Sequence, residues 1–318
     1  MHAPRTAYLE SAPLAPGDTV ALVSPSGPGT RSSTARAVRS LEAWGLRVRV
    51  GEHVLDKHSR ASYLAGEDDA RRTDFVRAWS DPDVDAVICA RGGYGAMRLL
   101  DGIDWEALRE HGARRDGRPK LLTGSSDITA LHEAVRVHLD APTLFCPMPG
   151  NGVFRDSSAV RDDVHRWLFS PWAGRSIIGP RIETMVSGRA EGRFTGGNLS
   201  LLAAALGAPE ASRPPSGILF LEDIDEELYR LDSLMLQLQR SGRLASADGI
   251  VLGSWHRCGN RDAVRDLMEE YLSGLGVPVL WEQGFGHDPE AISVPLNVDG
   301  VLHASDDACS LSVTASAS

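Results

Sequence analysis

A serine at a predicted strand-to-helix corner, Ser126, is the residue of this 318-residue chain best suited to nucleophilic chemistry. Two leucines lead into Gly124-Ser125-Ser126, and a helical pattern follows. A serine at such a corner projects its hydroxyl outward beside unpaired backbone N–H groups, which suits a nucleophile next to an oxyanion site. We therefore predict Ser126 as a nucleophile.

The same segment has a purely structural interpretation. Serine and aspartate are ordinary helix N-caps, so Ser126 and Asp127 could simply begin a helix over 127–139. The Gly-x-Ser-x-Gly elbow of the α/β-hydrolases is not met either, because Ile128 stands at its fifth position. The serine alone therefore does not decide between a cap and a nucleophile.

A serine nucleophile needs a base and a group that orients the base. Glu222 is the first charge after the apolar run 217–221, a position that is unfavourable unless the carboxylate is hydrogen-bonded. His287 stands in the glycine-flanked turn 284–288, where glycines allow a sharp bend and leave the imidazole projecting from a loop. Taken singly each could be structural, but together with Ser126 they form a catalytic set.

Several blocks, in order along nearly the whole chain, resemble the LD-carboxypeptidase family of serine peptidases, which includes murein tetrapeptide carboxypeptidases and microcin C self-immunity hydrolases. The matching blocks lie at residues 16–28, 63–66, 81–87, 90–95, 124–129, 196–199, 221–223 with 229–230, and 286–287.

The resemblance implies that Ser126 is the nucleophile, Glu222 the orienting carboxylate and His287 the general base. It also implies an oxyanion hole made by the backbone N–H groups of Gly93 and Asp127. The chain departs from the family at Ser125, where an aromatic residue is common, and at residues 145–148, where His-Gly-Pro-Met is common. Both departures lie near the expected active face, so substrate preference could differ while the catalytic set is complete.

A carboxypeptidase must also recognise a terminal carboxylate, which calls for an arginine or lysine fork or exposed backbone donors. Arg91 and Arg230 lie within matching blocks, as do Asn198 and Tyr229. These four are candidate substrate-binding residues, although an arginine beside a glycine turn or on a helix is often structural.

The leading functional hypothesis is a serine carboxypeptidase that cleaves an L-to-D amide bond and releases terminal D-alanine from a muropeptide tetrapeptide. An alternative within the family is a microcin C-type immunity hydrolase that cleaves an amide in a peptide-nucleotide or other antibiotic. Residues 221–230 resemble the carboxypeptidase branch more closely. A third hypothesis is a noncatalytic ligand-binding protein, because α/β folds host many unrelated functions.

Composition excludes several other classes. A net charge of −10 argues against nonspecific nucleic-acid binding, which relies on clustered lysine and arginine. Neither a Gly-Lys-Ser/Thr phosphate loop nor a complete dinucleotide fingerprint is present, and we expect no cofactor or metal. No apolar run reaches the roughly 18 to 20 residues of a membrane helix, and no secretory signal follows Met1. We expect a cytoplasmic protein, and the resemblance implies a homodimer.

The four cysteines lack the paired spacing of zinc sites and are too few to staple a chain of this length. Cys89 lies in an apolar strand, where a small buried hydrophobe is expected. Cys146 borders the expected pocket, but no helix start or histidine next to it would activate a thiolate. We therefore predict free thiols and place the nucleophile at serine.

Strands alternating with helices up to residue 145 predict a parallel sheet covered on both faces, a three-layer α/β domain with its catalytic groups at the carboxyl ends of strands. A smaller C-terminal mixed α/β domain follows, with a hairpin expected around Asp299-Gly300, a strong turn dipeptide. The predicted domains are residues 1–153, which carry the nucleophile, and 185–318, which carry the glutamate and histidine. A Pro- and Gly-containing linker region, 154–184, separates them.

Overall fold

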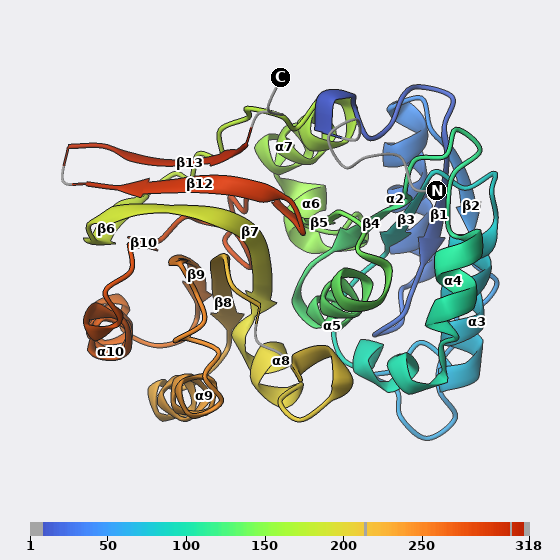
Figure 1. The fold of residues 1–318 in the computed structure, drawn as a ribbon. Helices are drawn as coiled ribbons and strands as arrows, with labels where there is room; N and C mark the ends of the chain where they lie inside the picture. Colours follow the sequence, from blue (N-terminus) through green and yellow to red (C-terminus); the bar gives the residue numbers. More distant parts are fainter. Residues whose placement is uncertain (1–8, 213–214, 306, 315–318) are drawn as a thin grey trace. The chain divides into compact units, whose positions relative to one another are not determined.

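The computed structural model describes residues 9–212, 215–305 and 307–314. Its chain divides into two compact units, one ending at Ala173 and the other beginning at Gly174 (Figure 1). Both units mix helices and strands, which confirms the predicted α/β class. The division falls inside the predicted linker, whereas the predicted boundaries at 153 and 185 stay a prediction.

The first unit is a parallel sheet in the order β5, β4, β3, β1, β2, as the alternation of strands and helices predicts. Its elements are β1 (Thr19–Val23), α2 (Arg31–Ala43), β2 (Arg47–Val50), α3 (Asp68–Ser80), β3 (Ala86–Cys89), η1 (Ala96–Gly102), α4 (Trp105–His111), β4 (Leu121–Gly124), η2 (Ser126–Ile128), α5 (Thr129–Ala134), η3 (Val135–Leu139), β5 (Thr143–Phe145), α6 (Gly152–Asp156) and α7 (Ser158–Phe169).

One face of this sheet packs against α3, α4 and α5. Val87 and Leu122 from the strands join Phe75, Leu108 and Leu131 from the helices in one buried cluster. All strands run the same way, so the carboxyl ends of β1, β3 and β4 share one edge. Chain segments that leave this edge include the serine, the glycine turn and the loop after β1.

The second unit is a mixed sheet in the order β13, β12, β7, β8, β9, β10, β6. Its central strands β7 to β10 are parallel, and the outer pairs are antiparallel. Its elements are β6 (Glu183–Val186), β7 (Gly188–Asn198), α8 (Leu199–Ala204), η4 (Pro209–Ala211), β8 (Ile218–Ile224), α9 (Leu228–Arg240), β9 (Gly249–His256), α10 (Arg261–Leu272), η5 (Ser273–Leu275), β10 (Val279–Trp281), β11 (Val294–Leu296), β12 (Asp299–Ala304) and β13 (Cys309–Val313).

Alternation along β8 separates the two faces of this sheet, as expected for successive strand residues. Leu219 and Leu221 pack with α8, α9 and α10 in one buried cluster. Phe220 points the other way and contacts Phe194 and Phe285 edge-on, with ring centroids 5.0 and 5.5 Å away. Both faces of the strand are therefore covered where it reaches Glu222, near its carboxyl end.

The hairpin expected around Asp299-Gly300 is wrong. Both residues lie in β12 and pair with Arg193 and Gly192 of β7, while the connection to β13 follows Ala304. A Cβ at Gly300 would come within 1.9 Å of the Phe194 ring. The glycine therefore permits close packing of an aromatic ring rather than a turn.

In the described part of the chain, no helix is both long and apolar enough to cross a bilayer.

Candidate active site

Ser126 lies in a strained bend directly after β4. Its φ is +61°, in the left-handed region that L-residues other than glycine rarely adopt. Every other residue from Leu121 to Val135 is buried, whereas Ser126 is partly exposed. A strained, outward-facing serine between a strand and a helix is the geometry of a nucleophile elbow, not that of an N-cap with extended backbone.

The side chain of Asp127, next to the serine, is 2% exposed and joins three segments. Its Oδ2 accepts a hydrogen bond from the Ser26 hydroxyl at 2.5 Å and another from the backbone N–H of Ala96 at 2.8 Å. Ser26 follows β1, and Ala96 follows the glycine turn after β3. The carboxylate thus fixes the serine bend to both neighbouring loops.

Arg71 binds the loop after β1 and the glycine turn after β3, and its side chain is 1% exposed. Its guanidinium donates to the carbonyls of Pro25 and of Gly95, the latter at 2.9 Å, and pairs with Asp68. Burial lowers the pKa of Arg71, and the neighbouring carboxylates, Asp68 foremost and then Asp127, act against that lowering. Sequence reasoning missed Ser26, Arg71 and the side chain of Asp127. Arg71 lies in the first turn of α3 and carries no local signal, because its loop partners are distant in the sequence.

The glycine turn after β3 packs against the serine. A Cβ at Gly92 would come within 3.1 Å of the Ser126 Cβ, so a larger residue would crowd the serine. Gly93 follows with φ +122°, a conformation that favours glycine. The carbonyl of Gly92 accepts from Gly27 at 3.2 Å. This part of the site therefore joins the two sequence blocks that resemble the family's serine and glycine motifs.

In the second unit, buried Glu222 and partly exposed His287 form a hydrogen-bonded pair. Oε2 of Glu222 lies 2.7 Å from Nδ1 of His287, and the glutamate side chain is fully buried. The backbone N–H of His287 donates to Oγ of Ser254 at 2.9 Å. A carboxylate on Nδ1 fixes the ring and leaves Nε2 available for proton transfer.

Two opposing effects act on the pKa of His287. Burial lowers it, but the neighbouring Glu222 carboxylate raises it and prevails, so the net pKa lies above its ordinary value of 6.5. Burial, followed by the charge of Glu222, raises the pKa of Asp223. The second unit therefore concentrates negative charge around an imidazole.

Of the four candidate substrate residues, Asn198 lies closest to this pair. Its Nδ2 donates to Glu222 at 3.1 Å and to Asp223 at 2.9 Å, so it orients the carboxylates. Tyr229 is 67% exposed at the start of α9, and Arg230 beside it forms an exposed ion pair with Glu226. In the first unit, exposed Arg91 donates to the carbonyl of Pro28 at 3.0 Å. Their roles toward substrate stay a prediction.

All four cysteines are free, as predicted. Burial raises the pKa of the Cys146 thiol to about 12 and holds that of Cys89 well above its usual range. A thiol with such a pKa carries almost no thiolate near neutral pH. The cysteine-nucleophile alternative is therefore disfavoured.

Comparison with known proteins places both units in one family. The LD-carboxypeptidase N-terminal domain matches residues 20–145, and the LD-carboxypeptidase C-terminal domain matches residues 191–302. A putative carboxypeptidase of Streptomyces coelicolor is 45% identical over 93% of this chain and 94% of its own. A probable murein peptide carboxypeptidase of Bacillus subtilis is 34% identical over 91% and 90%.

Solved structures agree with these matches. A muramoyltetrapeptide carboxypeptidase from Oxalobacter formigenes has a TM-score of 0.78 at 27% identity, covering 93% of this chain and 98% of its own. An MccF-like protein from Bacillus anthracis has a TM-score of 0.84 at 21% identity, covering 96% and 98%, and that likeness concerns the fold alone.

Proposed function

The chain belongs to the LD-carboxypeptidase family of serine peptidases, and from that premise we propose that it cleaves an L-to-D amide bond and releases terminal D-alanine from a muropeptide tetrapeptide. The names of the Bacillus relative and of a murein tetrapeptide carboxypeptidase of Pseudomonas aeruginosa, 32% identical over 89% of this chain and 92% of its own, support this substrate class. The observation that carries the proposal is the pair formed by Glu222 and His287 in a chain that also holds Ser126 in a strained bend.

In the proposed mechanism, Nε2 of His287 takes the Ser126 proton as the hydroxyl attacks the scissile carbonyl. The resulting imidazolium is stabilised by Glu222 and then protonates the leaving amine, and a water molecule hydrolyses the acyl-enzyme by the same route. The backbone N–H groups of Gly93 and Asp127 hold the oxyanion, and in comparable enzymes one such donor lowers the activation free energy by about 3 kcal/mol. The mechanism requires the two units to bring Ser126 and His287 within hydrogen-bonding reach.

Mass spectrometry of a muropeptide tetrapeptide incubated with the protein tests this proposal. We expect loss of one D-alanine, and we expect Ser126→Ala, Glu222→Ala and His287→Ala each to reduce kcat by roughly three or more orders of magnitude while the melting temperature is retained. Full activity in all three variants would exclude the mechanism. Partly exposed His303, on β12, provides a matched control as His303→Gln.

An aminoacyl sulfamoyl adenylate, incubated in parallel, tests the microcin-type alternative. One solved structure in the comparison is MccF in complex with aspartyl sulfamoyl adenosine, at 24% identity. Release of a free amino acid from the adenylate, with no D-alanine from the muropeptide, would favour the immunity hydrolase over the carboxypeptidase.

We further propose that the protein acts as a cytoplasmic homodimer, as the family resemblance implies. Light scattering coupled to size-exclusion chromatography measures the molecular mass of the protein in solution. Since one chain has a mass of 34.2 kDa, a dimer should have about twice that mass. Cell fractionation tests the location. A monomer, or a secreted protein, would contradict these two proposals without touching the catalytic one.

A further inference from the structure

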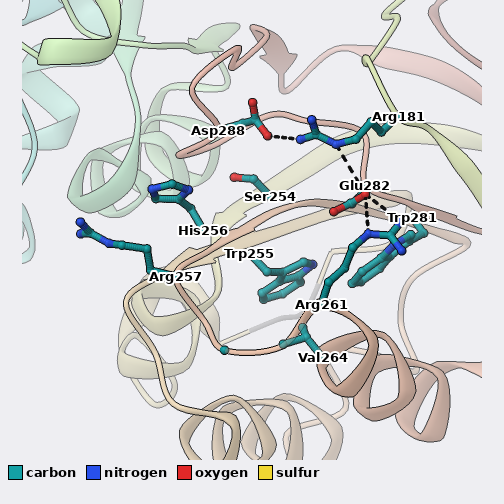
Figure 2. Close-up of a pocket in the computed structure, with 11 residues that line it drawn as sticks. Arg181, Ser254, Trp255, His256, Arg257, Arg261, Val264, Trp281, Glu282 and Asp288 are labelled. Atoms are coloured by element: carbon teal, nitrogen blue, oxygen red, sulfur yellow. Dashed lines mark hydrogen bonds and ion pairs between the residues drawn. The ribbon is translucent and has the colours of Figure 1, made fainter.

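Charged side chains hold the loop that carries His287. Figure 2 shows Arg181 paired with Asp288, the residue after the histidine, and with Glu282, the first residue after β10. The bend that carries Ser126, in the first unit, has a different support. That support is a buried histidine which the proposed mechanism does not use.

This histidine is His132, on α5, and its side chain is 2% exposed. Its Nε2 lies 2.9 Å from the carbonyl oxygen of Gly124, two residues before Ser126. Burial lowers the pKa of His132 to about 4, so the ring is neutral near pH 7. Because a carbonyl oxygen can only accept a hydrogen bond, Nε2 carries the proton and donates it.

The Gly124 carbonyl does not need this donor in order to be satisfied. The backbone N–H of Cys146, which follows β5, already donates to the same oxygen at 3.0 Å. The other ring nitrogen of His132, Nδ1, is buried and has no hydrogen-bond partner among the described residues. A buried polar atom without a partner lowers stability, and an apolar side chain at position 132 would avoid that loss. This combination indicates a need for orientation rather than for stability.

Two donors on one carbonyl fix the plane of the peptide group between Gly124 and Ser125, because peptide groups are planar. The chain is crowded here, since a Cβ on Gly124 would lie 2.9 Å from the Ile128 side chain. Ser126 follows with φ +61°, and a left-handed residue other than glycine persists only where its surroundings hold it. The hydrogen bond from His132 is one such restraint, placed where the bend begins.

We propose that His132 is a positioning residue for Ser126: its Nε2–H holds the Gly124 carbonyl, and through it the bend that presents the serine hydroxyl. The inference rests on the proposed function, since the histidine has this role only if Ser126 is the nucleophile. His132 acts through the backbone and not on the substrate. Loss of its donor should therefore slow the attack by the serine and leave substrate binding unchanged.

Two substitutions of equal length separate the donor from the ring. His132→Gln places an amide N–H as many bonds from Cα as Nε2 of the histidine, whereas His132→Met has the same length and no donor. We expect kcat of His132→Met to fall about tenfold or more with KM unchanged, and kcat of His132→Gln to stay within about threefold of wild type. Both variants lose the ring that contacts Phe145, with centroids 5.7 Å apart, so the ring cannot explain a difference between them.

Stability should not follow the rate. His132→Met leaves no unpaired polar side-chain atom at the buried position, so its denaturant midpoint at pH 7 should equal or exceed that of His132→Gln. Equal kcat in the two variants would overturn the proposal. A lower midpoint together with a lower kcat in His132→Met would assign the loss to a folding defect and also count against it. The same two substitutions at partly exposed His303, on β12, are the control and should leave kcat unchanged.

Covalent labelling of Ser126 separates this inference from the proposed function. A fluorophosphonate forms a phosphorus–oxygen bond with a nucleophilic serine and releases fluoride and the hydroxyl proton, so the reaction needs no peptide substrate. Followed by intact-mass spectrometry, labelling should be about tenfold slower in His132→Met than in wild type or His132→Gln, with Ser126→Ala as the blank. If the rates differ in this way but no muropeptide is cleaved, the proposed function fails and the inference stands. A wild-type protein that is neither labelled nor active would remove the nucleophile, and the inference with it.

Discussion

Nδ1 of His287 lies 2.7 Å from Oε2 of Glu222, a carboxylate with no exposed side-chain surface. An isolated buried carboxylate would be strongly unfavourable, so the imidazole and the amide of Asn198 are the groups that stabilise it. The same contact fixes which ring nitrogen is available to a substrate. The same hydrogen bond therefore stabilises the buried carboxylate and orients the imidazole for proton transfer.

The pH dependence of catalysis should reflect this pair. The net pKa of His287 is raised by Glu222, so the neutral, basic imidazole is lost already above pH 6.5 as the pH falls. In Glu222→Gln the acid limb of kcat/KM should move to lower pH, and kcat should fall about 10³- to 10⁴-fold. A pH profile from 5 to 9 measures both. An unmoved limb would contradict the assignment of His287 as the base.

The side chain of Asp127 should control the rate through its hydrogen bonds. Asp127→Ala removes the acceptor for Ser26 and Ala96, and we expect kcat to fall about 10²-fold with KM little changed. Asp127→Asn retains an oxygen acceptor and should recover most of the rate. Asp69→Asn, at a side chain that is 86% exposed, is the control. Equal losses in the alanine and asparagine variants would show that the charge, not the geometry, matters.

A methyl group at Gly286 should disrupt the hydrogen-bonded pair of Glu222 and His287. Its φ is +105°, and a Cβ there would lie 2.3 Å from Oε2 of Glu222. We expect Gly286→Ala to reduce kcat about as strongly as Glu222→Ala, measured by steady-state kinetics. Gly207→Ala is a close match because Gly207 has φ +94° and no neighbour within 4 Å. Equal activity of the two variants would contradict the expected displacement of the carboxylate.

Buried His132 should make stability depend on pH. Burial lowers its pKa from 6.5 to about 4, so the unfolded chain binds the extra proton more readily between these values. Its contribution to folding is therefore complete above pH 6.5 and is lost as the pH falls toward 4, by up to about 3 kcal/mol. Denaturant unfolding at pH 4.5 and 7 measures this loss, which should be smaller in His132→Gln. An equal pH dependence in both proteins would contradict it.

Local patterns predicted the elements of the first unit well because strand and helix periods alternate clearly there. The helix expected from Asp127 is preceded by the 3-10 turn η2, whose first residue is the left-handed Ser126. Helices α7 and α10 each begin after a polar N-cap, Ser157 or Asn260, whose side chain accepts a backbone hydrogen bond from the first turn. Caps and periods are local signals, which one sequence carries by itself.

Contacts between distant segments could not be predicted in the same way. Ser26 and Asp127 are separated by 101 positions, and Arg71 reaches two loops that only the sheet order brings together. Gly300 carried the signal of a turn, but its small size serves the Phe194 ring of another strand. Such roles depend on the register between strands, and that register is set by packing across the whole unit.

The left-handed backbone at Ser126 lowers the free energy of unfolding by roughly 1 kcal/mol, the cost for an L-residue in that region. Glycine would adopt the bend without that strain but would have no hydroxyl. Laboratory selection for heat resistance alone would consequently tend to discard the reactive group, so engineering campaigns on this protein should hold position 126 constant while they vary the surroundings.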